Sequence, residues 1–254
     1  VVSEDGCVAV SAELKDGGLY YSVSRDGKPV VRNSATGLET DVADFTQELP
    51  VPTVTTSSAD ISYSVITGKK SSVKTHYEEM TLAFEKSGFQ YEIIFRAYRD
   101  GYAFRYRLAP TGGGEEFVVI GDEATAFALP ASSTTYLMTA PNYTDRFDYE
   151  RNYSRKDSDK INGVIAAMPM LYQTEEGVWS LVTESDVVDS GYRGSFLEGN
   201  GEGAFRIQPA YTQSLSVVTT APFLSPWRVG IVGSLADIVE STLVEDVYDK
   251  VGYY

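Results

Sequence analysis

Hydrophobic and polar residues alternate over long stretches of the chain, which is the pattern of a β-strand with one buried face. Tyr102, Phe104 and Tyr106 would share one side of such a strand. Arg105 and Arg107 would share the other side. The alternation predicts that the aromatic side packs on a core and that the arginine side lies on the opposite face of a sheet.

Short turn sequences divide the alternating stretch around these residues. Turns at 86–88 and 99–101 each contain a glycine. They separate strands at 81–85, 89–98 and 102–108, which predicts an antiparallel meander.

A second hairpin is predicted near the N-terminus. Asp26-Gly27 joins the strands 19–25 and 28–31, because this dipeptide readily adopts the positive φ angles of a tight turn. Further strands are predicted at 163–171, 178–183, 204–207, 214–219 and 227–232.

Helical periodicity is scarce. The clearest case begins at Ser234, a good N-cap, with Asp237 in the first turn. Leu235, Ile238 and Val239 would share one face of this short helix. The sequence therefore predicts an all-β fold of stacked antiparallel sheets, with at most one or two short helices.

The charge of the chain disfavours two classes of binding partner. The 254 residues include 21 Lys and Arg against 36 Asp and Glu, a formal net charge of −15. This acidity argues against nucleic acid and against an anionic membrane surface as partners, because both are bound through clustered basic residues. No stretch approaches the roughly 18 consecutive apolar residues of a membrane span.

Single copies of two residue types exclude several sites. Cys7 is the one cysteine, so an internal disulfide and a cysteine-based zinc site are excluded. His76 is the one histidine, which excludes sites that need two imidazoles. The phosphate-loop, dinucleotide, nucleophile-elbow, zinc-protease and calcium-loop motifs are all missing from the sequence.

Two carboxylates follow a strongly apolar strand. Glu184 and Asp186 stand two positions apart at the end of the strand 178–183, so they would project from the same face. Such oxygens could serve a hard cation such as calcium, which needs six to eight ligands and therefore further residues. The alternative is an ordinary polar strand end.

One irregular segment mixes rings with carboxylates. Tyr143, Asp145 and Tyr149 belong to the stretch 142–153, where no clean periodicity is present. Most tyrosines elsewhere alternate within strands and are expected in the core or on a sheet face. A loop of this composition is expected to face a sugar ligand or a partner domain.

The sequence resembles the N-terminal domain of glycoside hydrolase family 97, which contains starch-utilisation α-glucosidases and related α-galactosidases. The order and spacing of several short segments across almost the whole chain carry this resemblance. They are DGGLYYSV at 16–23, DGKPV at 26–30, GLE at 37–39, KTHYEE at 74–79, RDGYAFRY at 99–106, LVTE at 181–184, SPWRV at 225–229 and DIVES at 237–241.

The resemblance implies a β-super-sandwich similar to galactose-mutarotase domains, formed by residues 1–254 as one domain. It implies that this domain packs on a catalytic (β/α)8 barrel of the same polypeptide, so we expect no hydrolysis from this chain by itself. It also implies an α-linked oligosaccharide substrate and a periplasmic or secreted bacterial location. By motif position, Glu184 would contribute one ligand to a calcium ion held mainly by the barrel.

The residues leave two other functions open. An autonomous carbohydrate-binding module would stack sugars on Tyr143, Phe147, Tyr149 and Tyr153. A mutarotase-like epimerase would need histidines beside a glutamate for proton transfer, and the single His76 disfavours it.

Overall fold

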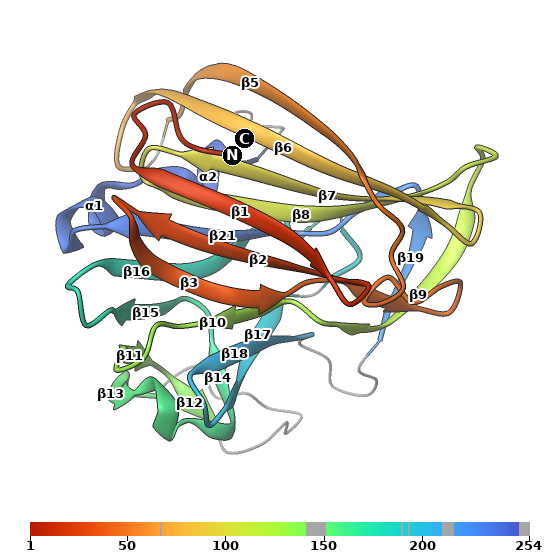
Figure 1. The fold of residues 1–254 in the computed structure, drawn as a ribbon. Coiled ribbons are helices and arrows are strands. Elements are labelled where there is room, and N and C mark those ends of the chain that lie inside the picture. The colour runs from red at the N-terminus through yellow and green to blue at the C-terminus, as the bar shows by residue number, and fades with distance from the viewer. Residues whose placement is uncertain (67, 141–150, 189, 193, 210–215, 249–254) are drawn as a thin grey trace.

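The alternating segments pair into three antiparallel sheets in the described part of the chain, which is residues 1–254 without 67, 141–150, 189, 193, 210–215 and 249–254. We call them the front, back and small sheets, after their places in this computed structural model (Figure 1). The front and back sheets stack face to face, so that each has one buried side. The predicted all-β fold is therefore confirmed.

The front sheet contains the N-terminal hairpin that the sequence predicts. Asp26 and Gly27 have φ angles of 50° and 75° and form the turn between its second and third strands. From edge to edge its strands are β1 (Val8–Lys15), β2 (Gly18–Arg25), β3 (Lys28–Ala35), β10 (Ala126–Ala128), β18 (Ala204–Pro209), β17 (Ser195–Asn200), β14 (Asn162–Ala167) and β12 (Thr139–Ala140).

The back sheet contains the predicted meander as three long strands that pair in sequence order. Tyr102, Phe104 and Tyr106 are fully buried on its inner side, as their alternation predicts. Its strands follow the order β13 (Ser154–Asp157), β11 (Thr134–Leu137), β15 (Met170–Gln173), β16 (Trp179–Ser185), β21 (Trp227–Gly233), β8 (Gly101–Pro110), β7 (Phe89–Tyr98), β6 (Ser72–Lys86) and β5 (Thr53–Ser64), and β20 (Phe223–Leu224) also pairs with β8.

The small sheet and the helices complete the fold. The small sheet has the order β19 (Val217–Ala221), β9 (Glu116–Glu123) and β4 (Leu38–Thr40). The helices are the 3-10 turn η1 (Ser158–Lys160), α1 (Leu235–Glu240) and α2 (Leu243–Asp246). Ser234 and Asp237 form a reciprocal capping box that starts α1, which confirms the predicted helix start. No helix among the described residues is long and apolar enough to cross a membrane.

Aromatic rings fill the space between the front and back sheets. The ring of Tyr21 on β2 lies 4.8 Å from that of Phe104, which lies 5.3 Å from Phe95 (centroid distances). Two tyrosines of this layer donate their hydroxyls to backbone carbonyl oxygens at 2.9 Å, Tyr21 to Ala126 and Tyr172 to Val30. These contacts explain the tyrosine content as core packing, because each ring buries a large apolar area and keeps one polar atom.

The strand predicted at 163–171 is wrong as a single element. Residues up to Ala167 belong to β14 in the front sheet, and residues from Met170 belong to β15 in the back sheet. Pro169 stands at the junction, where its missing N–H removes a ladder hydrogen bond. The chain therefore crosses between the two layers at this point.

The outer side of the back sheet has its own buried cluster. Trp227 lies between Arg96 and Arg105, whose guanidinium carbons are 4.5 and 4.3 Å from its ring. Ile238 of α1 and Leu243 of α2 belong to the same apolar cluster. Arg105, predicted for the face opposite the aromatic side chains, is thus confirmed there, packed on tryptophan.

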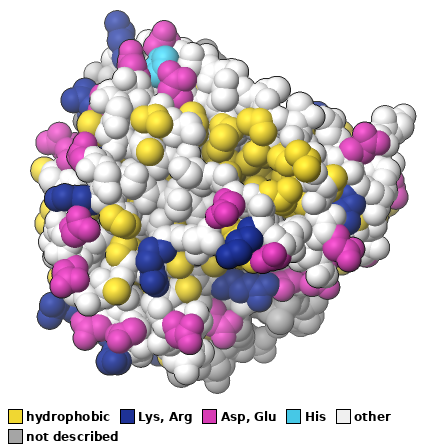
Figure 2. All heavy atoms as spheres, viewed as in Figure 1, with side chains coloured by type: hydrophobic (Ala, Val, Ile, Leu, Met, Phe, Trp, Pro, Cys, Tyr) yellow, Lys and Arg dark blue, Asp and Glu magenta, His cyan; other side chains and the backbone are white. Residues whose placement is uncertain are grey.

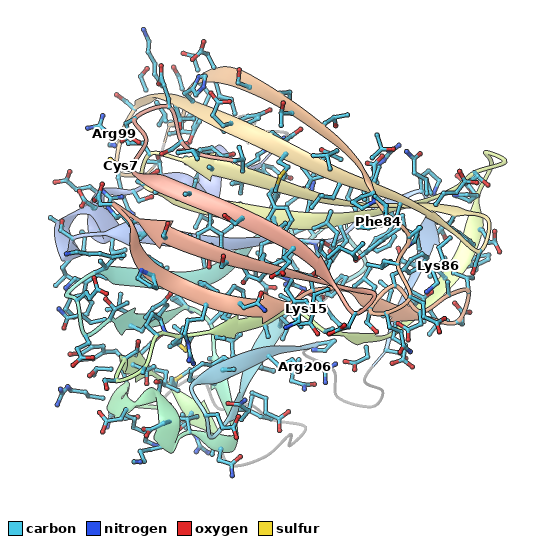
Figure 3. The ribbon with its side chains drawn as sticks, viewed as in Figure 1. Cys7, Lys15, Phe84, Lys86, Arg99 and Arg206 are labelled. Carbon is cyan, nitrogen blue, oxygen red and sulfur yellow. The ribbon has the colours of Figure 1, made fainter. Side chains whose placement is uncertain are left out.

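The surface carries an apolar patch beside the edge strand β1. Apolar side chains gather there between β1 and the β5–β6 pair (Figure 2). Lys86 at the end of β6 donates to the carbonyl oxygens of Asp44 and Gln47, both at 2.6 Å, and so ties the back sheet to the loop that follows β4 (Figure 3).

Candidate functional site

Glu184 lies at the end of β16, where it pairs in register with Arg228 on β21. Its Oε1 accepts the backbone N–H of Ser195 at 2.8 Å. Its Oε2 accepts Nη1 of Arg228 at 2.7 Å. The side chain is 12% exposed. Both carboxylate oxygens are therefore engaged by donors of the protein.

Arg228 lies at the centre of this group and is fully buried. It donates from Nε and Nη2 to the two oxygens of Glu123, at 2.9 and 2.6 Å, and from Nη1 to the hydroxyl of Ser195 at 3.2 Å. The hydroxyl of Tyr192 donates to Oε2 of Glu123 at 2.9 Å. We call Glu123, Glu184, Tyr192, Ser195 and Arg228 the Arg228 cluster.

Charge complementarity holds this cluster together. Burial by itself would lower the pKa of Arg228, but the carboxylates of Glu123 and Glu184 outweigh burial and raise that pKa well above its usual range. Burial, reinforced by Glu123, raises the pKa of the Tyr192 hydroxyl, so it stays a hydrogen-bond donor. Two carboxylates around one guanidinium leave one formal negative charge.

Asp186 lies on the other side of the back sheet from Glu184. Its Oδ2 accepts from Nη1 of Arg105 at 3.5 Å. Arg105 follows Phe104, which faces Arg228 across the strand pair, so the two arginines occupy opposite faces. The expectation that both carboxylates share a face is wrong, because Asp186 stands beyond β16 with a φ of 58° and turns the chain.

The described residues around Glu184 do not form a calcium site by themselves. Nη1 of Arg228 takes one lone-pair direction of Oε2 at 2.7 Å, and the N–H of Ser195 takes one of Oε1 at 2.8 Å. Among the described residues, no group of three or more His, Cys, Asp or Glu side chains is arranged to hold a metal ion. We therefore derive no step through calcium.

The remaining predicted site residues cannot be compared with Glu184. Tyr143, Asp145 and Tyr149 lie outside the described residues. Tyr153, predicted with them as a sugar-stacking ring, is described and is 58% exposed.

His76 has partners on both ring nitrogens. Nδ1 lies 2.9 Å from a carboxylate oxygen of Asp60, and Nε2 lies 3.1 Å from one of Glu78. These two hydrogen bonds raise the pKa of His76, because the protonated ring can donate to both carboxylates. A ring held in this way is a cross-strand bridge between β5 and β6.

A polar groove of about 930 Å³ lies beside this histidine. Its lining includes side chains from the N-terminal segment, β5, β6 and the α1–α2 region, among them Asp60, His76 and Asp246. Asp246 accepts the hydroxyl of Tyr63 at 2.6 Å, and burial raises the pKa of this carboxyl to about 6.

Sequence reasoning missed most of the Arg228 cluster. Glu123 and Arg228 are 105 positions apart, and no local pattern joins them. A signal exists at Arg228, which interrupts an otherwise apolar strand that is buried on both sides. A charged residue at such a position requires a buried partner. Arg206 (Figure 3) adds a contact from β18, donating to the backbone oxygen of Glu123 at 3.2 Å.

Comparison with known proteins agrees with this architecture. The chain is 28% identical over 232 residues to a probable retaining α-galactosidase of Streptomyces bingchenggensis, covering 91% of the chain and 34% of that protein. It is 24% identical over 216 residues to a retaining α-galactosidase of Bacteroides thetaiotaomicron, covering 82% of the chain and 31% of that protein. The chain thus spans about a third of the length of these curated relatives.

Solved structures show the same fold. A family 97 glycoside hydrolase from Pseudoalteromonas sp. strain K8, in complex with panose, superposes with a TM-score of 0.87 at 24% identity, over 98% of this chain and 38% of that one. A β-arabinopyranosidase superposes with a TM-score of 0.89 at 27% identity, over 100% of this chain and 44% of that one. The family model described as glycosyl-hydrolase 97 N-terminal matches residues 1–249. The chain therefore belongs to the N-terminal domain family of glycoside hydrolase family 97.

Proposed function

We propose that this chain is the non-catalytic N-terminal domain of an enzyme that hydrolyses α-linked glycosides, and that it packs on the enzyme's catalytic (β/α)8 barrel. The observation that carries the proposal is the share of each relative that the chain matches. Between 82% and 91% of the chain matches retaining α-galactosidases, yet the match spans about a third of those proteins. The chemistry would then belong to the part of the polypeptide that this chain does not match.

The buried chemistry of the domain supports a scaffold role. In the Arg228 cluster, the described carboxylates Glu123 and Glu184 face a guanidinium and a tyrosine hydroxyl. Glycoside hydrolysis needs two carboxyl groups across a substrate, about 5 to 10 Å apart, with one free to donate a proton. Glu123 is fully buried and serves as an acceptor. These contacts stabilise the sandwich and leave Glu123 no access to a sugar.

Activity assays test the proposal directly. The chain by itself is assayed with aryl α-galactosides and aryl α-glucosides, next to the longer polypeptide encoded by the same gene. We expect turnover from the longer polypeptide and none from this chain, and the preferred glycoside identifies the substrate class. Robust hydrolysis by the purified chain would contradict the proposal.

A binding assay separates the scaffold from an autonomous carbohydrate-binding module. The chain is titrated calorimetrically with malto-oligosaccharides and galacto-oligosaccharides. A domain that serves as a docking partner for the barrel binds neither, whereas a module binds one of them through exposed rings. Calcium and a periplasmic or secreted location remain predictions for the longer polypeptide.

A further inference from the structure

The first three residues of the chain lie as a short strand beside the start of β1. Val2 and Ala9 form an antiparallel bridge pair. The amino group of Val1 donates to the carbonyl oxygen of Val10 at 2.8 Å, and the N–H of Val10 donates to the carbonyl oxygen of Val1 at 2.8 Å. Such reciprocal bonds are those of an antiparallel ladder. The backbone of Val1 is therefore arranged like that of a residue inside a strand.

The rest of this edge of β1 is open. The N–H and C=O groups of Val10 point toward Val1, so those of Ala12 and Leu14 point the same way, because the direction repeats every second residue. Among the described residues, pairing on this side of β1 stops at Val10. Side-chain burial changes at the same point. Val10 is 1% exposed, whereas Ala12 and Leu14, on the same side of the strand, are only half-buried.

The back sheet extends beyond the front sheet at this edge. Strand β1 packs over β7 and β8, so the next strand position of the front sheet lies over β6 and β5. Val54 on β5 is directly opposite Leu82 on β6 and shares its inner face. Leu82 is 5% exposed, but Val54 is 54% exposed. The inner face of β5 is therefore uncovered where a further front-sheet strand would lie.

We propose that an extended segment, joined to the amino group of Val1 in the longer polypeptide, continues this short strand along β1 and completes the front sheet. Its last four residues would pair with positions 11–14, in the antiparallel register that Val1 and Val10 already set. The second and fourth residues before Val1 would face inward opposite Ala12 and Leu14, so these two positions take apolar side chains. The inference does not depend on the proposed function.

Two observations favour a segment of the same polypeptide. The first residues run along β1 toward its start, so a backbone continued before Val1 enters the opening beside β1 without a turn (Figure 1). Burial also lowers the pKa of the Val1 amino group, because a charge is disfavoured at this position. An amide N–H would make the same hydrogen bond to Val10 without a charge.

Two other occupants are disfavoured. A separate peptide would gain only the few hydrogen bonds of positions 11–14 and would lose its translational freedom on binding. A second copy of the chain would bring a formal net charge of −15 against the same charge. A covalently joined segment avoids both costs, since it is always present at high effective concentration.

Amide hydrogen exchange tests the occupant. The chain that begins at Val1 is compared with the same chain carrying the segment that precedes Val1 in the mature polypeptide, as defined by mass spectrometry. Exchange at Ala12 and Leu14 is expressed relative to Ile93 on β7, which reports global opening in the same sample. We expect the segment to slow both amides by roughly tenfold or more in this ratio.

A matched pair of designed extensions tests which side chains the position takes. Val-Thr-Val-Thr joined before Val1 places its valines opposite Ala12 and Leu14, whereas Thr-Val-Thr-Val has the same composition and turns its valines to solvent. The first extension should slow the two amides by roughly tenfold, and the second by less than about twofold. Neither extension replaces a residue of the chain, so a folding defect cannot cause the difference.

Three results would overturn the assignment. The first is exchange at Ala12 and Leu14 that the natural segment leaves unchanged, or a mature polypeptide that begins at Val1. The second is equal slowing by the two designed extensions, which would show that the uncovered inner face does not select apolar side chains. The third is slowing that increases with protein concentration in the chain that begins at Val1, which would assign the open edge to a second copy.

Discussion

Arg228 donates two hydrogen bonds to the two carboxylate oxygens of Glu123, and neither side chain has any exposed surface. The pair joins β21 of the back sheet to the end of β9 in the small sheet. It therefore couples two layers whose strands share no ladder in the described part of the chain. Fully buried ion pairs are costly to break, because the remaining charge keeps its desolvation penalty.

Arg228→Leu should be strongly destabilising. The variant leaves Glu123 buried without its cation, and we expect the free energy of unfolding at pH 7 to fall by about 3–5 kcal/mol. Arg107→Leu is the matched control, because Arg107 also pairs with a glutamate but is 43% exposed. Its cost should stay below about 1 kcal/mol. Urea denaturation of the two variants measures the difference. Equal losses would show that the buried pair stabilises the fold no more than the exposed one.

A double-mutant cycle isolates the charge contribution. Arg228→Leu leaves the negative charge of Glu123 buried without a partner, and Glu123→Gln removes that charge. The combined variant should therefore lose less stability than the sum of the two single variants. Additive losses, measured under the same urea conditions, would show that the two side chains act separately.

Local patterns account for the parts of the fold that the sequence predicts. The turn at Asp26 and Gly27 and the capping box of Ser234 and Asp237 depend on residues within a few positions, and the structure contains both. The Arg228 cluster depends on stacking of distant strands, which no local pattern contains. Asp186 shows a third case, because its positive φ of 58° rotates the chain and overrides the two-residue repeat of the preceding strand.

Gly230 should not tolerate a side chain. It lies on β21 directly opposite Tyr102 on β8, and an added Cβ would overlap the ring carbons of this fully buried tyrosine. We expect Gly230→Ala to lower the free energy of unfolding by about 1–3 kcal/mol through overpacking. Chemical denaturation measures this loss.

Gly121 on β9 provides the control for that substitution. A Cβ there would have Glu39 O as its nearest neighbour, at 3.9 Å, which is ordinary contact. Gly121→Ala should therefore change the free energy of unfolding by less than about 1 kcal/mol. The expected direction is a gain, because alanine lowers the conformational entropy of the unfolded chain. Similar losses at Gly121 and Gly230 would rule out the ring of Tyr102 as the cause.

Asp246 should make the domain less stable as pH rises through the mildly acidic range. Burial raises its pKa to about 6 from the ordinary value of 3.8. Between these values the folded state binds more protons than the unfolded state, so the free energy of unfolding falls as pH increases. Asp246→Asn should remove this fall and be more stable than the wild type at pH 7.5, as measured by thermal unfolding between pH 4 and 7.5.

Asp237 should behave in the opposite way. Hydrogen bonds from Ser234 lower the pKa of this carboxyl, so its stabilisation is present above the unfolded pKa and is lost as pH falls through the folded one. Asp237→Asn should therefore cost stability at neutral pH and little in strong acid. If Asp237→Asn and Asp246→Asn changed the free energy of unfolding in the same direction at pH 7.5, the opposite pKa shifts of the two carboxyls would be contradicted.

The two tryptophans of the chain should respond differently to an ionic quencher. Trp227 is fully buried between Arg96 and Arg105, so iodide cannot reach its ring although both neighbours are cationic. Trp179 on β16 is partly exposed and packs against the tilted ring of Tyr136 at a centroid distance of 5.6 Å. Iodide quenching of fluorescence should therefore disappear in Trp179→Phe and persist in Trp227→Phe. Quenching that is lost in Trp227→Phe would show that the outer face of the back sheet admits solvent at the arginine–tryptophan stack.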